Sequence, residues 1–203
     1  DIERALNDTT GDAVLLNIDS PGGEATGINE LADAIYAGRK KKPMWSYVEG
    51  MGASAAYWLA SATARIVIDE TAALGSIGVV MAVPDPTKRT AKDIEFVSSQ
   101  SPNKRPDPTT ERGRGQLQAI VDDMAAVFVA RVAMHRGVSE DHVLSEFGAG
   151  GLRVGQAAVK AGLADGLGSF EGTLADLQRH VRTQQGYSAR AEFRRAFAQG
   201  VIT

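Results

Sequence analysis

The sequence predicts an α/β fold with a largely parallel sheet, because short apolar runs alternate with stretches of helical periodicity. Residues 13–18 (AVLLNI) are almost all apolar, as in a strand buried on both faces. From Glu24 the apolar residues recur every three or four positions, as at Ile28 and Ile35, which predicts a helix with one buried face. Residues 44–48 then have the composition of a second strand. Strands that alternate with helices at this spacing favour right-handed crossovers between parallel strands.

The same alternation continues through the middle of the chain. The glycines of residues 50–52 predict a turn, and the small residues of 53–64 predict a helix after it. Further strands are expected at residues 66–68, 77–83 and 94–98.

The second half of the chain is predicted to be mainly helical. Residues 99–110 are polar and contain three prolines, which indicates a loop. A long amphipathic helix follows and is expected to end at Gly137, and Ser139 should cap a short helix. Two more short helices are expected at residues 156–161 and 173–181. We therefore expect one domain over residues 1–181 and a polar, amphipathic tail over residues 182–203.

Composition limits the possible function classes. The net charge of −3 does not indicate a nucleic-acid or anionic-membrane partner, and the basic run at residues 39–42 is interpreted as a solvated helix end. The chain has no cysteine, which excludes disulfides, thiol nucleophiles and thiolate metal ligands. No apolar run is long enough to span a bilayer. Because the sequence opens with Asp1 inside a helix-like pattern, we expect that an N-terminal piece has been removed.

Two glycine-rich turns are expected at the carboxyl edge of the sheet, where open α/β folds place their sites. The first, residues 20–23 (SPGG), fits an ordinary type II turn. It also fits a turn whose glycines let backbone N–H groups approach a substrate carbonyl.

The second turn, residues 50–56 (GMGASAA), contains Ser54 at the start of the predicted helix. A serine at this position is commonly an N-cap. Three features favour a nucleophile instead. Small residues leave space around the hydroxyl, the N–H of Ala55 lies where an oxyanion donor is needed, and the SPGG turn should be adjacent.

A serine nucleophile needs a neighbouring base. The three histidines, His135, His142 and His180, all lie in the C-terminal third on predicted helices and are interpreted as surface or helix-end residues. A lysine can replace histidine if it is neutral at working pH, which requires burial or a nearby cation. Lys104 lies between prolines and beside Arg105, which makes it a candidate, whereas the other lysines lie in polar or charged runs: Lys40, Lys41, Lys42, Lys88, Lys92 and Lys160.

Taken together, these motifs resemble those of the S49 peptidase family, which includes signal peptide peptidases and phage head-maturation proteases. The matching segments are DSPGG at 19–23, GMGASAAYWLAS at 50–61, GSIGV at 75–79 and a lysine fifty residues after the serine. The similarity runs from about Ala5 to Leu177. The resemblance implies a ClpP/crotonase-like fold with repeated βαβ units and a helical C-terminal part.

The resemblance also implies roles for individual residues. Ser54 would be the nucleophile, Lys104 the general base, and Ser76 would hold the lysine amine. The N–H groups of Gly22 or Gly23 and of Ala55 would form the oxyanion hole. The implied mechanism is acylation of the serine followed by hydrolysis, with no metal or cofactor.

Substrate, assembly and location follow from the same resemblance. The substrate would be a polypeptide, either a signal peptide or a capsid or scaffold protein, bound near Met51 and Gly52 with small or apolar side chains beside the cut bond. A homo-oligomer is expected, with no nucleic-acid partner. The compact length favours the phage-type members and hence a cytoplasmic location at the prohead. Membrane association is expected only if the absent N-terminus carries an anchor.

The sequence departs from the family in three places. Ala55 stands where many relatives have glycine, the loop around Lys104 reads SPNKRPDP, and the family's opening strand is absent. Two other functions remain open on the same fold: a catalytically inactive assembly or scaffold protein, and a crotonase-type acyl-CoA hydratase or isomerase. The latter would need a catalytic carboxylate at the second turn. A ClpP-type triad would need a histidine a strand and a loop after Ser54, and none is present there.

Overall fold

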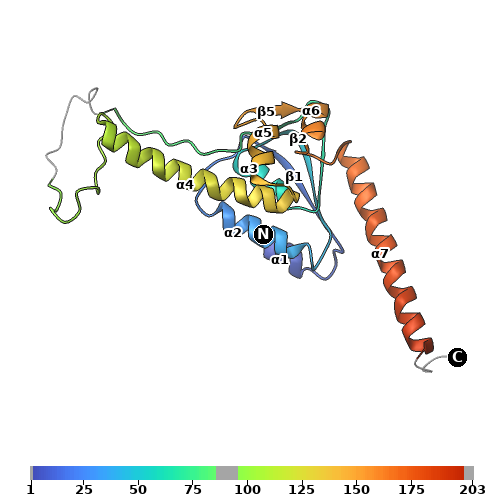
Figure 1. The fold of residues 1–203 in the computed structure, drawn as a ribbon. Helices are drawn as coiled ribbons and strands as arrows, with labels where there is room; N and C mark the ends of the chain where they lie inside the picture. The colour runs from blue at the N-terminus through green and yellow to red at the C-terminus, as the bar shows by residue number, and fades with distance from the viewer. Residues whose placement is uncertain (1, 86–95, 199–203) are drawn as a thin grey trace.

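The computed structural model describes residues 2–85 and 96–198, which form a mixed α/β molecule around one curled, mostly parallel sheet (Figure 1). The strands are β1 (Val14–Ser20), β2 (Met44–Ala53), β3 (Arg65–Ile68), β4 (Ala73–Gly75), β5 (Leu152–Val154) and β6 (Gly166–Leu167). The helices are α1 (Ile2–Asn7), α2 (Ile28–Gly38), α3 (Ala55–Ser61), α4 (Glu111–Arg136), α5 (Glu140–Glu146), α6 (Gly155–Ala161) and α7 (Phe170–Ala198). The predicted α/β class is confirmed, and the arrangement is compatible with a ClpP-like fold.

Strand β2 is the centre of the sheet. Strand β1 lies parallel to it from the Val14–Met44 pair to the Ile18–Val48 pair, and the register then shifts before Ser20 meets Gly52. Strand β3 pairs with the first half of β2 and β4 with its last three residues, both in parallel. Strand β5 is antiparallel to β4. The last residues of β2 therefore lie between the end of β1 and β4.

Alternate side chains of β2 face two different helical layers. Met44, Ser46 and Val48 are fully buried, and Met44 and Val48 belong to the main apolar core with α3. On the other face Trp45 lies 5.5 Å from the His180 ring, and an edge-to-face contact of 5.8 Å joins Tyr47 to the first residue of α7. The first part of α7 therefore covers the face of the sheet that α3 does not.

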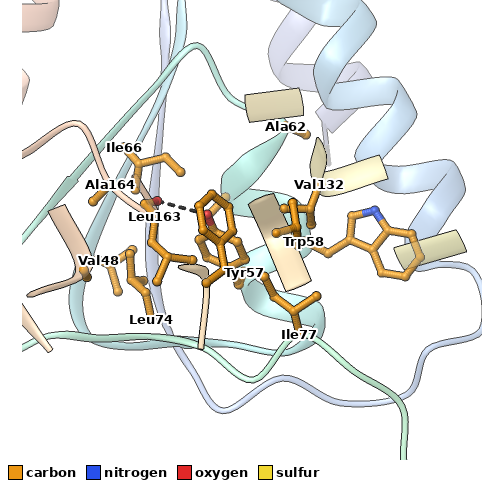
Figure 2. Packing of buried hydrophobic residues seen from close by; sticks show 14 of the residues in the cluster. Val48, Tyr57, Trp58, Ala62, Ile66, Leu74, Ile77, Val132, Leu163 and Ala164 are labelled. Atoms are coloured by element: carbon orange, nitrogen blue, oxygen red, sulfur yellow. Dashed lines mark hydrogen bonds between the residues drawn. The ribbon is translucent and has the colours of Figure 1, made fainter. Parts of the chain in front are cut away.

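Helix α3 is fixed in the core by its two largest side chains (Figure 2). The Tyr57 hydroxyl is fully buried and donates a hydrogen bond of 3.1 Å to the carbonyl oxygen of Leu163. Trp58 stacks on Phe128 of α4 with ring centroids 4.3 Å apart. Because both side chains are held, the turn that leads into α3 is anchored on the side of the helix.

Helix α4 is packed along only part of its length. Phe128 and Val132 near its C-terminal end are buried, whereas Ile120 and Val127 are both 46% exposed. Its N-terminal half extends beyond the sheet (Figure 1). The helix ends as predicted at Gly137, which takes a left-handed φ of 67°, and the predicted cap of α5 is confirmed because the side chain of Ser139 accepts the N–H of His142.

Several predicted elements are wrong. Residues 50–52 are not a turn but continue β2, and the helix predicted from Glu24 begins four residues later, at Ile28. The apolar run at residues 77–83 is not a strand, since it lacks strand pairing and Val80 is 93% exposed. In the predicted strand at 94–98, residues 96–98 form no strand and the first two lie outside the described residues.

The C-terminal part also differs from the prediction. The short helix expected at residues 173–181 is the beginning of α7, which continues through residue 182 to Ala198. The helix points away from the body of the molecule at its far end (Figure 1). Strands β5 and β6 were not predicted, because two or three residues are too few to show a periodic pattern.

Candidate active site

Ser54 lies between the end of β2 and the start of α3 in a conformation that is uncommon for serine. Its φ is 52° and its ψ is −126°, and its backbone N–H donates to the carbonyl oxygen of Gly75 over 2.9 Å. It stands at the N-cap position, but its side chain makes no capping hydrogen bond. The N-cap interpretation therefore does not account for this serine, whose hydroxyl is left available for another role.

The SPGG turn presses directly against this serine. Gly22 has a φ of 101°, and a Cβ added to it would lie 2.6 Å from the Ser54 Cβ and 3.0 Å from the Ala55 nitrogen. Only glycine allows this approach, because any side chain would overlap the serine turn. The SPGG turn and the segment around Ser54 are thus adjacent, as expected from the sequence.

The backbone donors of the predicted oxyanion hole differ in what they bind. The N–H of Gly22 already donates to the Ser20 hydroxyl over 3.2 Å. Ala55 is the first residue of α3, and the first N–H groups of a helix have no partner within the helix. Gly23 follows on an exposed part of the same turn. Of the two candidate glycines, Gly23 is therefore the one whose N–H has no partner within the described part of the chain.

Ser76 lies beside Ser54 at the end of the neighbouring strand. Ala53 and Gly75 are paired in the sheet, so the two serines follow paired residues. Ser76 also has a positive φ of 53°, and its N–H donates to the carbonyl oxygen of Gly151 over 2.8 Å. The structure therefore brings the predicted nucleophile and the predicted orienting serine to the same edge of the sheet.

Both serines line a cavity of about 680 Å³. Its walls come from the SPGG turn, from residues 77–81, from the middle of α4 and from the glycine-rich loop before β5. Three non-glycine residues with positive φ occur in the described chain, Ser54, Ser76 and Ala149, and all three line this cavity. Strained backbone of this kind clusters at functional sites. The cavity is thus a candidate active site.

A second, smaller cavity of about 350 Å³ lies next to the first and shares Gly23 and Glu24 with it. Its apolar lining includes Ile18, Ile28 and Leu59, together with the first residues of α3. The two cavities therefore meet at the glycine turn beside Ser54.

Sequence reasoning missed most of the cavity walls. Met51 and Gly52, the predicted substrate-binding residues, line neither cavity, because both lie within β2 and the N–H of Met51 donates to Asp19 over 2.9 Å. The walls come instead from residues 77–81 and from Val121 and Met124 of α4. The GSIGV motif pointed to the first of these segments, whereas no sequence signal places α4 there.

Lys104 is not among the residues that line the Ser54 cavity. It is exposed, and its described backbone contact is a local bond from its N–H to the carbonyl oxygen of Ser101. The segment that carries it leads into the end of α4 that lies beyond the sheet (Figure 1). Within one chain, the structure does not bring Lys104 to Ser54.

The three histidines lie away from the Ser54 cavity as well. His135 lies in the last turn of α4, which fits the expected helix-end position, but it is buried and shares a hydrogen bond of 3.0 Å with the Ser61 hydroxyl. Burial lowers the pKa of His135 to about 4. His142 packs edge-on against Phe147 and His180 packs on Trp45. The ionisable side chains among the described residues that line the cavity are those of Glu24 and Asp122.

Within residues 2–85 and 96–198 there is neither a metal site nor a membrane-spanning helix. No cluster of histidine and acidic side chains there is arranged to hold a metal ion. None of the helices in residues 2–85 and 96–198 has both the length and the apolar character needed to cross a bilayer.

Comparisons with known proteins agree with the resemblance seen in the motifs. The model of Peptidase family S49 matches residues 37–184. The chain is 35% identical over 172 residues to the head-tail preconnector protein GP5 of Enterobacteria phage P21, covering 82% of this chain and 34% of that protein. It is 34% identical over 172 residues to the capsid assembly protease C of Escherichia phage lambda, covering 82% and 39%. With Protease 4 of Haemophilus influenzae the identity is 25% over 190 residues, covering 91% and 31%. The chain thus spans between about a third and two fifths of these relatives.

Proposed function

The chain belongs to peptidase family S49, and we propose that it is a serine endopeptidase in which Ser54 is the nucleophile. The observation that carries the proposal is the conformation of Ser54. Its backbone is strained, its hydroxyl makes no capping bond, and it faces a cavity against the glycine turn. A serine held in this way at a strand-to-helix turn presents its hydroxyl for attack on a bound carbonyl.

The proposed reaction has two steps that use the same groups. The base removes the proton of the Ser54 hydroxyl as its oxygen attacks the scissile carbonyl carbon, and the C–N bond then breaks as the base returns the proton to the leaving amine. Water, deprotonated by the same base, attacks the resulting ester. The ester C–O bond breaks, the serine regains its proton and the acid product leaves.

Charge that develops on the carbonyl oxygen is stabilised by backbone donors. The proposed donors are the N–H of Ala55 and the N–H of Gly23, and Gly22 supplies the close approach between the two turns. Gly22 therefore contributes by its lack of a side chain and not by its N–H, which donates to the Ser20 hydroxyl.

We assign the role of base to Lys104 of a neighbouring copy of the chain. In one chain Lys104 is exposed and precedes α4 by seven positions, and the cavity is lined by α4 residues from Gln118 onward. A helix rises about 1.5 Å per residue, so the start of α4 alone lies roughly 10 Å from this lining. A second copy can bring the projecting segment to the site, where Ser76 would hold the lysine amine. Under this assignment the Ser–Lys dyad forms only in the homo-oligomer, with Ser54 from one copy and Lys104 from the next.

The proposed substrates are capsid or scaffold polypeptides. Two relatives are named as a head-tail preconnector protein and a capsid assembly protease, which favours a role in capsid assembly in the cytoplasm over cleavage of signal peptides. The cavity walls from Val121, Met124 and Ala125 are apolar, so small or apolar side chains are expected next to the cut bond.

Labelling with a fluorophosphonate tests the proposal and separates an enzyme from an inactive scaffold. We expect the wild-type chain to be labelled and Ser54→Ala to be neither labelled nor active, at unchanged stability, since Ser54 makes no capping bond. Ser139→Ala is the matched control: it removes a true helix cap, which costs about 1 kcal/mol, but should leave labelling intact. Equal labelling of Ser54→Ala and the wild type would refute the proposal.

A further inference from the structure

A third cavity, of about 400 Å³, lies at the other end of β2 from Ser54. It is formed where the end of α2, the start of β2 and the middle of α7 meet. Its lining contains four cationic side chains, one histidine and no acidic residue: Tyr36, Arg39, Lys40, Lys41, Lys42, Pro43, Trp45, Ala64, His180 and Gln184. The basic run predicted to be a solvated helix end does follow α2, but it borders this cavity.

Arg39 is the most informative of these side chains. Its guanidinium lies over the Tyr36 ring, 4.6 Å from the centroid, which fixes its direction. One of its nitrogens, Nη1, is buried and has no hydrogen-bond partner among the described residues. A buried donor without a partner is costly. Arg39 also lines the cavity, so an anion bound there would lie beside its guanidinium charge.

The lysines of the run are not equivalent. The Lys42 ammonium donates to the carbonyl oxygen of Ala5 over 2.9 Å and also to that of Asp8, so it holds the end of α1. Lys40 and Lys41 are exposed and form no ion pair within the described part of the chain. Two free ammonium groups therefore accompany the unsatisfied guanidinium.

The cavity is also lined by Trp45 and His180, whose rings pack together. Trp45 is 6% exposed, and its ring lies 5.0 Å from the guanidinium of Arg65 and 5.5 Å from the ring of His180. His180 is held in turn by Gln184 of the next helical turn, over 2.9 Å. The cations thus share one cavity with packed rings.

We propose that this cavity binds the carboxylates of an acidic segment of the polypeptide substrate. A guanidinium presents paired N–H groups that match a carboxylate, and two lysines add charge for a second and third acid. The cavity is small and the chain carries a net charge of −3, so it lacks the extended basic stripe that a nucleic acid needs. That the peptide is a substrate rests on the proposed peptidase function.

The position of the cavity gives the proposal a geometric consequence. Ser54 follows the end of β2, nine positions after Trp45, which at about 3.3 Å per residue is roughly 30 Å along the chain. A substrate that occupies both sites therefore needs up to about nine extended residues between its acidic segment and the bond to be cut. A spacer of three residues spans only about 11 Å and is too short to join the two ends of β2.

Binding can be measured without catalysis. In the full-length Ser54→Ala protein, a fluorescein-labelled peptide with three glutamates should bind saturably, as followed by anisotropy, and its glutamine analogue should not. Arg39→Gln and Lys41→Gln should each weaken binding by about tenfold. Lys160→Gln, which removes the same charge from the exposed face of α6, should leave binding unchanged. Since Lys41 is exposed, its variant should fold even if the Arg39 variant does not.

Two outcomes of this measurement would overturn the proposal. One is binding that is equally strong in Lys41→Gln, Lys160→Gln and the parent protein. The other is tighter binding of a short oligothymidylate than of the acidic peptide, with the same dependence on Lys41, since the ligand would then be a nucleic acid.

Hydrolysis tests the spacing. An acidic segment joined to a cleavable peptide should lower KM through a flexible linker of fifteen residues but not through one of three, with kcat unchanged. A benefit that is independent of linker length contradicts the geometry. Fluorophosphonate labelling separates the two proposals. Peptide binding without labelling of Ser54 would refute the serine mechanism and leave the acidic-peptide site in place. Labelling of Ser54 without peptide binding would refute the acidic-peptide site and leave the serine mechanism in place.

Discussion

Replacement of Gly22 by alanine should inactivate the protein without unfolding it. The added Cβ would lie 2.6 Å from the Ser54 Cβ, 2.7 Å from the Ala53 carbonyl oxygen and 3.0 Å from the Ala55 nitrogen. None of these atoms is the end of a flexible side chain, so the backbone of one turn must move away from the other.

The size of the effect follows from these distances. A comfortable contact is about 3.5–4 Å, so the turns must separate by roughly 1 Å. Misplacement of reacting groups by about 1 Å costs on the order of a hundredfold in rate. The φ of 101° adds backbone strain of about 1–3 kcal/mol for a residue with a side chain, which is a limited loss of folding free energy. We therefore expect kcat/KM to fall by about a hundredfold with a modest loss of stability.

Gly27→Ala is the matched control. Gly27 also has a positive φ, of 83°, but a Cβ there would meet nothing within 4 Å. It should lose similar stability in urea denaturation while keeping its peptidase rate and fluorophosphonate labelling. A Gly22→Ala protein that is folded and retains a rate within about threefold of the wild type would show that the contact between the turns does not set the geometry of the site.

Three further predictions concern the base and the buried histidine. Lys104→Arg should be as inactive as Lys104→Ala in peptide hydrolysis, because arginine stays charged and cannot act as a base. Substitution of all three histidines (His135, His142 and His180) should leave most of the hydrolysis rate in place. The reverse pattern would indicate a histidine base. When the inactive Ser54→Ala and Lys104→Ala proteins are mixed and their subunits exchange, part of the peptidase activity should return. A mixture that forms mixed oligomers but stays inactive would exclude a base from the neighbouring copy. Burial lowers the pKa of His135 from 6.5 to about 4, so between these pH values His135 is protonated in the unfolded chain but not in the folded chain. The free energy of unfolding, measured in urea, should therefore fall by about 2 kcal/mol from pH 7.5 to pH 5. It should fall by clearly less in His135→Gln.

The elements that could be predicted from the sequence are those whose signal is local. The apolar run at residues 13–18 predicts strand β1, Gly137 predicts the end of α4, and Ser139 predicts the start of α5. Each of these signals depends only on residues close by in the sequence. The nearness of the two glycine turns could also be predicted, because parallel strands end at the same edge of a sheet.

The features that could not be predicted depend on tertiary contacts. Residues 77–83 have the composition of a strand, but part of the run lines a cavity instead, and a periodicity argument cannot distinguish a wall from a buried strand. The position of α4 over the cavity has no local signal either. The place of Lys104 relative to Ser54 depends on a polar segment whose path is not determined by burial.

The strain at the candidate site has a structural explanation in the core beneath it. A serine with positive φ persists only where its surroundings hold it there. Ser54 is held on the strand side by its N–H bond to Gly75 and on the helix side by α3, through the Tyr57–Leu163 bond and the Trp58–Phe128 stack. Gly22 then closes the remaining side by contact. Ser54 is therefore held by the main core and, separately, by contact with Gly22. Because Gly22 contacts the serine turn and is not part of the core, the hydrolysis rate is expected to depend on Gly22 far more than the stability does.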